Sequence, residues 1–241
     1  MKLLLTLTTL FFFLFTQSQT CIIAKKTKDA IYVGADSRLT TQRKIISTGK
    51  IITDTSSVCK IYTYGKFNFA IEGAFINNAT NEAKEACSKG KSFNEIIKIY
   101  YTSFGSKLPE YLTTLKKYSP ITFDTLFANH QWFSQIIFFG EEHDSLYLNM
   151  LYFKVTDTSS KSFRIEAGGG TNDVLISGHI HEIKDLVNKP ETWATGEVNT
   201  INNLIRIETK YHPVEVGGFT DIIKYTKKIG GVWIQRKQQC N

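Results

Sequence analysis

The sequence lacks the short motifs that usually mark metal and phosphate sites. Its four cysteines show none of the C-x-x-C spacing that zinc sites use. The triple glycine at 168–170 is not followed by the Gly-Lys-Ser/Thr ending of a phosphate-binding loop. His179 and His181 fall in a segment expected to be helical, where residues two apart do not share a face. We therefore expect neither a metal nor a cofactor.

The sequence also lacks an arginine-rich stripe. The formal charge is +7 at pH 7, and the basic residues occur in small groups such as Lys25-Lys26, Lys116-Lys117 and Lys227-Lys228. A nucleic-acid surface needs a concentrated basic patch, often with aromatic side chains interleaved. The charge pattern therefore favours a solvated basic surface, and we expect no nucleic-acid partner.

No apolar run is long enough to span a membrane comfortably. The apolar segment from Leu3 to Phe15 covers about thirteen residues, follows a single charge at Lys2 and precedes a short polar run. This is the pattern of a secretory signal peptide, which is removed on export. We expect residues 1–19 to be a signal peptide, the mature chain to be secreted or periplasmic, and no stable membrane anchor.

The sequence leaves the cleavage position open. Small residues at Thr16 and Ser18 suit a cut that makes Gln19 the first residue, and trimming of Gln19 would then free Thr20. Small residues at Ser18 and Thr20 suit a cut that exposes Cys21 instead. The mature chain is therefore expected to begin at Gln19, Thr20 or Cys21.

Residues 20–241 amount to 241 minus 19, or 222 residues, which suits one compact domain. Their hydrophobic periodicity gives the order strands, helices, strands, helices, strands. This order is typical of two sheets packed face to face between helical layers, so we expect an α+β fold, a four-layer αββα sandwich. The expected strands cover the hairpin 20–38, 60–64, 67–71, 133–140, 146–155, 162–167, 219–225 and 232–236; the expected helices cover 74–88, 92–104, 109–115, 172–187 and 198–211; and 40–57 is expected to be a polar loop with a strand fragment.

The hairpin 20–38 is the stretch around which we expect the function to be organised. A hydroxyl and a thiol stand at its first two positions, Thr20 and Cys21, and the returning strand ends in a carboxylate, Asp36. A chain cut in front of this hairpin would begin with a free amine beside a nucleophile. The hairpin therefore has the components of a reaction centre.

The hairpin and the element order resemble the proteasome β-subunit and its bacterial ring-protease relatives, which are N-terminal-nucleophile hydrolases. In that family a threonine freed by autoprocessing precedes the aspartate of an Ala-Asp-Ser-Arg segment, and here Thr20 and Asp36 stand at the family's offset of 36 minus 20, or sixteen, residues. Lys60 begins a strand where the family has its active-site lysine, and Gly73 stands where it has a substrate-backbone glycine. The resemblance implies that Thr20, Asp36 and Lys60 are catalytic, that Gly73 contacts the oxyanion or the substrate backbone, and that the chain can form a homo-oligomer.

The later motifs depart from the family's pattern. The segment 167–171 resembles the family's Gly-Ser-Gly segment, but Gly169 replaces the serine, which leaves Thr171 as a possible supporting hydroxyl. The family's late aspartate and serine, which support the amine of the nucleophile, fall on Pro213 and Val216. If the amine is supported in this chain, other groups supply that support.

The implied reaction is hydrolysis of a peptide or a small amide. A free α-amine, with a pKa of about 7.7–8.0, can accept the proton of the threonine hydroxyl and return it to the leaving amine. Lys60 would help to keep the amine neutral, and Asp36 would orient Lys60. Backbone N–H groups beside Gly73 would bind the oxyanion.

Two other interpretations remain open at this stage. Cys21 is an alternative nucleophile, as in acylases whose terminal cysteine attacks an amide, and a non-catalytic ring-forming or binding module of the same fold is favoured by Pro213 and Val216. Strand alternation adds a structural expectation. If Thr20 and Lys60 face one side of a sheet, their neighbours Cys21 and Cys59 face the other, and a disulfide between the two cysteines is possible if their strands are adjacent.

Overall fold

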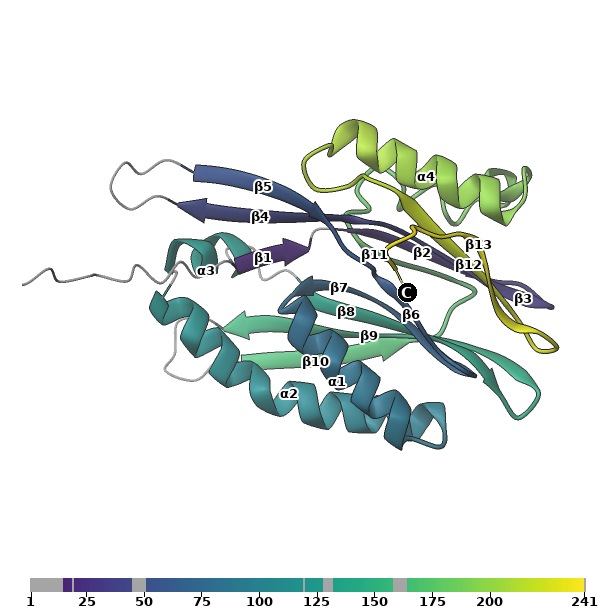
Figure 1. Ribbon diagram of the computed structural model, residues 1–241, viewed down its shortest axis with the longest axis horizontal. Coiled ribbons are helices and arrows are strands. Elements are labelled where there is room, and N and C mark those ends of the chain that lie inside the picture. Colours follow the sequence, from purple (N-terminus) through teal and green to yellow (C-terminus); the bar gives the residue numbers. More distant parts are fainter. Residues whose placement is uncertain are drawn as a thin grey trace, which may run out of the picture.

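Two antiparallel β-sheets occupy the centre of the molecule, between helices on either side (Figure 1). The computed structural model describes residues 15–18, 20–44, 51–118, 120–127, 132–157 and 164–240. The larger sheet has the strand order β10-β9-β8-β7-β1-β4-β5, with β6 paired to β7 beside this path, and the smaller sheet has the order β11-β2-β3-β12-β13. The strands of the larger sheet are β1 Phe15–Ser18, β4 Arg38–Lys44, β5 Ile51–Ser57, β6 Ile61–Tyr64, β7 Phe67–Ala74, β8 Trp132–Glu142, β9 Ser145–Asp157 and β10 Arg164–Gly170, and those of the smaller sheet are β2 Cys21–Lys26, β3 Ala30–Asp36, β11 Val174–Gly178, β12 Thr220–Thr226 and β13 Gly230–Gln235.

Three hydrophobic clusters hold these elements together. The first lies between the larger sheet and the helices α1 Ile76–Lys89, α2 Phe93–Tyr118 and α3 Pro120–Phe127. The second joins the two sheets and includes Val33, Ile137 and Ile223. The third packs the helix α4 Glu197–Tyr211 on the smaller sheet and includes Ile201 of the helix and Ile23 of the sheet. A short 3-10 helix, η1 Pro190–Trp193, precedes α4.

The helical segments follow their apolar periodicity. In α1 the small side chains Ala79, Ala83 and Ala86 are buried at helical spacing, as the sequence predicts. The two helices expected at 92–104 and 109–115 form one continuous helix, α2, with Pro109 inside it. Because the buried stripe of α2 continues through Leu108 and Leu112 on both sides of the proline, packing against the sheet outweighs the lost backbone hydrogen bond.

The helix expected at 172–187 is wrong. Residues 174–178 form β11, which pairs antiparallel with β2 from Val174 opposite Lys25 to Gly178 opposite Cys21. A short apolar run is compatible with either structure, and here the free edge of β2 provides backbone partners that favour a strand. The segment 40–57, expected to be a polar loop with a strand fragment, forms much of β4 and β5, which pair with each other. The triple glycine at 168–170 lies within β10.

The end of the expected signal peptide lies inside the larger sheet. Strand β1 runs antiparallel to both β4 and β7, with Gln17 opposite Thr40 and Ser18 opposite Gly73. The rest of the expected signal peptide, residues 1–14 and 19, falls outside the described residues. Within the described part of the chain, no helix combines the length and the apolar character needed to cross a membrane.

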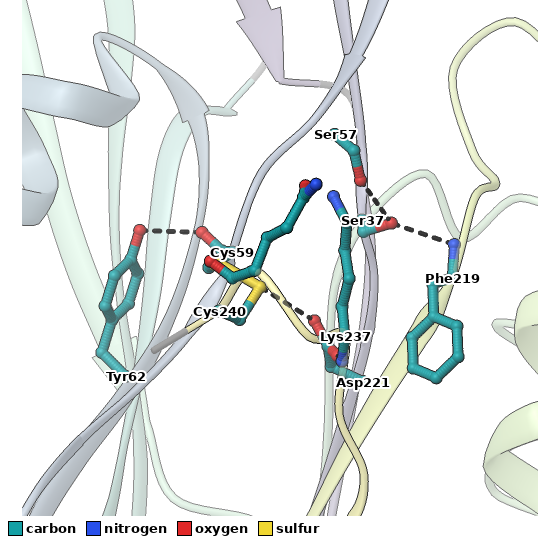
Figure 2. The surroundings of a disulfide bond; sticks show 9 residues. Ser37, Ser57, Cys59, Tyr62, Phe219, Asp221, Lys237 and Cys240 are labelled. Carbon is teal, nitrogen blue, oxygen red and sulfur yellow. Dashed lines mark hydrogen bonds between the residues drawn. A yellow bond between two sulfur atoms is a disulfide. The ribbon is translucent and has the colours of Figure 1, made fainter.

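A disulfide joins Cys59 to Cys240, so the proposed pairing of Cys59 with Cys21 is wrong (Figure 2). Cys21 begins a strand of the smaller sheet and packs on the α4 side, whereas Cys59 lies two residues before β6 of the larger sheet, so their strands are not neighbours. Cys21 and Cys87 are free, buried thiols. The disulfide fixes the C-terminal end of the chain to the residue before Lys60.

The disulfide gives the first prediction. Reduction, or the double substitution Cys59→Ser with Cys240→Ser, should lower the free energy of unfolding by on the order of 2–5 kcal/mol, because the bond closes a long loop in the unfolded chain. The two cysteines are separated by 181 residues, so the loop that the bond closes is long. We expect Tm to fall by roughly 5–15 °C when the bond is lost. Cys87→Ala is the control, and it should leave the effect of reduction unchanged because Cys87 is a free thiol. Detection of four titratable thiols in unfolded, unreduced protein would contradict the pairing.

Candidate active site

The carboxylate of Asp36, at the end of β3, is the centre of the candidate site. It is 1% exposed and accepts four hydrogen bonds. Its Oδ1 accepts the backbone N–H of Cys21 at 2.9 Å and the Nζ of Lys60 at 3.2 Å. Its Oδ2 accepts the backbone N–H of Gly217 at 2.9 Å and that of Arg38 at 3.1 Å. One side chain therefore connects β2, the start of β4, the residue before β6 and the loop after α4.

Lys60 forms a buried ion pair with this carboxylate. The lysine is 1% exposed, and its Nζ also donates to the backbone carbonyl of Arg38 at 2.6 Å. Burial lowers the pKa of Lys60 from its ordinary value, and the charge and hydrogen bond of Asp36 oppose that shift. The ammonium is therefore held by one carboxylate and one carbonyl in a site without access to water.

Thr20 precedes the residue whose backbone amide is bound by the carboxylate of this ion pair. It is fully buried, and the amide that follows it, the N–H of Cys21, is the one bound to Asp36. The carbonyl of Thr20 accepts the backbone N–H of His179 at 2.6 Å. Gly178 must be glycine here, because its φ is +86° and a Cβ would lie 1.7 Å from the Thr20 carbonyl oxygen. The structure thus places the three residues expected to be catalytic in one buried region.

The environment of Cys21 is unfavourable for a thiolate. The side chain is fully buried in the cluster under α4. Burial raises the pKa of its thiol well above the ordinary value, and the negative charges of Asp36 and Glu208 raise it further. A cysteine nucleophile needs a lowered pKa, so this surrounding argues against the alternative nucleophile.

Gly73 lies at the end of β7, opposite Ser134 of β8 and Ser18 of β1. Its φ is +110°, and a Cβ would lie 2.3 Å from the carbonyl oxygen of Phe133. The position therefore requires glycine, as expected for a residue whose backbone is approached closely on both sides.

The hydroxyl brought into this region is Ser177, whereas Thr171 is exposed between β10 and β11. Ser177 is 1% exposed, lies opposite Ile22 of β2 and donates to Oε1 of Glu72 at 3.2 Å. Sequence analysis missed both Ser177 and Glu72. The Ser-Gly pair ending an apolar run was the available signal for Ser177, and the helix expected at 172–187 obscured it.

Glu72 adds a second buried carboxyl group next to Gly73. Burial raises its pKa to about 8, while the hydrogen bond from Ser177 and the charge of Lys60 act in the opposite direction. At neutral pH this carboxyl is therefore mainly protonated, so the region contains one ion pair, Lys60 with Asp36, and a neutral acid.

Among the residues that the structure describes, no group of three or more His, Cys, Asp or Glu side chains is arranged to hold a metal ion. His179 and His181 were expected to lie on different faces of a helix, and this is wrong. Both follow β11, His179 in a bend and His181 in a turn. The described side chains gathered in this region are the hydroxyls of Thr20 and Ser177, the ammonium of Lys60 and the carboxyl groups of Asp36 and Glu72.

Comparison with known proteins adds little to this geometry. No family model and no curated protein matches the chain. Among solved structures, the chain is similar to Anbu from Hyphomicrobium sp. strain MC1, solved as a Gly-1 mutant, at 12% sequence identity and a TM-score of 0.48. The similarity covers 91% of this chain and 89% of that one. It is too distant to support a function, which has to be inferred from the site.

The buried ion pair gives the second prediction. Asp36→Ala should lower the free energy of unfolding by about 3–5 kcal/mol, because Lys60 and three backbone N–H groups lose their acceptor in the interior. The matched control is Asp173→Ala, which breaks the 3.5 Å surface pair with Lys26 and should cost less than about 1 kcal/mol. Urea unfolding of both variants measures the difference, and equal losses would contradict the central role of Asp36.

The pKa of Glu72 gives the third prediction. Its folded value of about 8 lies above the ordinary 4.5, so between these values the folded chain binds a proton that the unfolded chain has lost. The contribution of Glu72 to stability should therefore fall as pH rises through that window, by roughly 1.4 kcal/mol per pH unit.

Glu72→Gln should remove this pH-dependent contribution, because glutamine does not titrate. The free energy of unfolding of the variant, relative to that of the parent, should therefore increase from pH 5 to pH 8. The check is urea unfolding at several pH values, with Glu85→Gln at an exposed position as the control. A difference between parent and Glu72→Gln that does not change with pH would show that Glu72 titrates normally.

Proposed function

We propose that this chain is a hydrolase of amide or peptide bonds whose nucleophile is Thr20, and that it becomes active when the residues before Thr20 are removed. In this proposal the fold is the four-layer αββα sandwich of the N-terminal-nucleophile hydrolases. The observation that carries the proposal is the carboxylate of Asp36, which binds both the ammonium of Lys60 and the amide following Thr20. The Lys60 ammonium and the amide that follows Thr20 thus share one carboxylate oxygen, which supports a role for the lysine near the new amine.

The reaction follows from these groups. The freed α-amine of Thr20 takes the proton of its own hydroxyl, and the oxygen attacks the substrate carbonyl carbon. Lys60, positive and close, disfavours a second positive charge and so helps to keep the amine neutral. The tetrahedral oxyanion is bound by backbone N–H groups near Gly73; the C–N bond then breaks as the amine returns the proton to the leaving nitrogen. Water hydrolyses the resulting ester on Thr20.

The position of β1 supports a peptide as the substrate. This strand pairs with β4 on one side and β7 on the other, and its last residue, Ser18, lies opposite Gly73. Removal of β1 would leave two strand edges that face each other with unpaired backbone groups. An extended peptide is the ligand that satisfies such edges, with its scissile bond near Thr20.

We propose that the chain is exported, secreted or periplasmic, after removal of a signal peptide at 1–19. The disulfide between Cys59 and Cys240 supports this, because such bonds persist in oxidising compartments and are rare in the cytosol. The same bond anchors the residue preceding Lys60, so an oxidising environment would also favour a fixed position of the lysine.

The fourth prediction concerns the nucleophile. The exported protein should have the intact mass of a chain that begins at Thr20, and it should cleave members of a fluorogenic peptide-amide library. Thr20→Ala should reduce kcat by at least about a hundredfold, because it removes the attacking oxygen, while Thr20→Ser should retain part of the activity.

The variant Cys21→Ala tests whether Thr20 or Cys21 is the nucleophile. If Thr20 is, this variant should retain most of the activity. The proposal would be wrong if the exported chain begins at Cys21 and loses its activity in Cys21→Ala, or if Thr20→Ala cleaves the same peptides at the parent rate.

A further inference from the structure

A cluster of histidines and glutamates lies next to Thr20, beyond the residues described as the candidate site. His179 and His181 follow β11, and His212 follows the last residue of α4. The ring centroid of His212 is 5.1 Å from that of His179 and 6.2 Å from that of His181. Glu208 lies one helical turn before His212 and is fully buried.

Glu208 fixes the turn that follows β11. Its Oε1 accepts the backbone N–H groups of Glu182 at 2.8 Å and Ile183 at 3.1 Å. Its Oε2 is buried without a hydrogen-bond partner and lies 3.8 Å from Nε2 of His212. Burying a carboxylate is unfavourable unless it accepts hydrogen bonds. Loss of the two backbone hydrogen bonds would therefore be costly, and they hold the turn against α4.

This turn is also the part of the chain that contacts the backbone of Thr20. The N–H of His179 donates to the Thr20 carbonyl at 2.6 Å, and Gly178 pairs with Cys21. The backbone segment 179–183 is therefore held at both ends, by the carboxylate of Glu208 at residues 182 and 183 and by the Thr20 carbonyl at the N–H of His179. Movement of the turn away from α4 would move the residue that carries the proposed nucleophile.

The charge of Glu208 also acts near Thr20. Burial is the main cause of the raised pKa of the Cys21 thiol, but the charges of Asp36 and Glu208 raise it as well, and that of Lys60 lowers it. A freed amine on the neighbouring residue would experience charges of the same signs. Negative charge stabilises an ammonium and Lys60 destabilises it, so Glu208 would partly oppose the effect of Lys60.

The other charged groups around this turn are few. His179 is half-buried, and burial lowers the pKa of its imidazole. Glu215 and Asp36 favour its protonated form, whereas His212 and His181 disfavour it. Glu182 lies 3.9 Å from Nε2 of His212. The carboxylate of Glu208 thus faces one imidazole and two backbone amides, and a change of its charge should be felt on the Thr20 side of the turn.

We propose that Glu208 is a positioning residue for Thr20: its hydrogen bonds hold the 178–183 turn against the Thr20 carbonyl, and its negative charge sets the proton affinity of the freed amine together with Asp36 and Lys60. This inference rests on the proposed function only in assuming that Thr20 becomes the first residue. It assigns to α4 the support that Pro213 and Val216 cannot give, since neither side chain can hydrogen-bond or carry charge.

Two substitutions separate the two roles. In Glu208→Gln the amide oxygen can still accept both N–H groups, so the charge is lost while the hydrogen bonds remain. In Glu208→Asp the charge remains, but the shorter side chain cannot reach both N–H groups. Glu197→Gln, at the opposite end of α4, is the control for loss of one negative charge on the same helix.

The readout is oxidation of the N-terminal 2-amino alcohol of mature protein by periodate, followed by mass spectrometry from pH 5 to pH 9. The reaction needs the unprotonated amine, so its rate falls as pH drops below the pKa of the Thr20 amine. This acid limb of the rate-against-pH curve reports that pKa without requiring any hydrolysis. Glu208→Gln should move this limb to lower pH by on the order of half a unit, and Glu197→Gln should not move it. Glu208→Asp should keep the limb in place and lower kcat on the peptide-amide library roughly tenfold with a smaller change in KM.

The outcomes distinguish this inference from the proposed function. A shifted limb in Glu208→Gln from protein that cleaves no peptide supports the role of Glu208 and refutes the hydrolase. An unshifted limb, or equal shifts in Glu208→Gln and Glu197→Gln, overturns the role of the charge. A mature chain that resists periodate because it does not begin at Thr20 overturns both. Should Glu208→Gln not fold, Glu208→Asp still tests the positional role, and an unchanged kcat in that variant would refute it.

Discussion

The arrangement of this protein depends on one buried carboxylate. Asp36 accepts N–H groups from β2, from the start of β4 and from the loop after α4, together with the ammonium of Lys60. Removal from water makes both charges costly, and only this set of donors makes the burial tolerable. The ion pair can therefore form only after elements of both sheets and the loop after α4 have packed together. Its geometry is set by the whole fold and not by any single element.

The electrostatics of the region can be understood as a balance around Thr20. In the proposed mature chain Lys60 would disfavour a protonated amine on Thr20, Asp36 and Glu208 would favour one, and Glu72 would contribute little charge while it remains protonated. A general base works best when its pKa is near the working pH. Opposing buried charges would allow the pKa of the amine to be tuned without any change to the nucleophile itself.

Local patterns predicted the elements whose partners are near in sequence. Thr20 and Asp36 could be singled out because they stand at the two ends of the 20–38 hairpin, whose strands follow simple alternation. Lys60 could be singled out only through the resemblance to the proteasome β-subunit family, at the entry to the β6–β7 hairpin. Strand β11, the Cys59–Cys240 bond and the contact of Glu72 with Ser177 join segments more than a hundred residues apart, and β11 also depends on which sheet edge is free. The contacts of Glu208 with Glu182 and Ile183 span only 26 and 25 residues, but they depend on how α4 packs against the turn after β11. Periodicity contains no information on those choices, so the helix expected at 172–187 and the pairing of Cys21 with Cys59 failed for the same physical reason.

Strand β1 has a consequence for the uncut chain. A segment covalently attached to the site it occupies has an effective concentration in the millimolar range when the connection is short, and here the strand ends just before Thr20. Free peptides at micromolar levels could not compete with it for the edges of β4 and β7. Breaking one peptide bond would turn this intramolecular ligand into a dissociable one, so a single cleavage would both create the amine and empty the place for substrate.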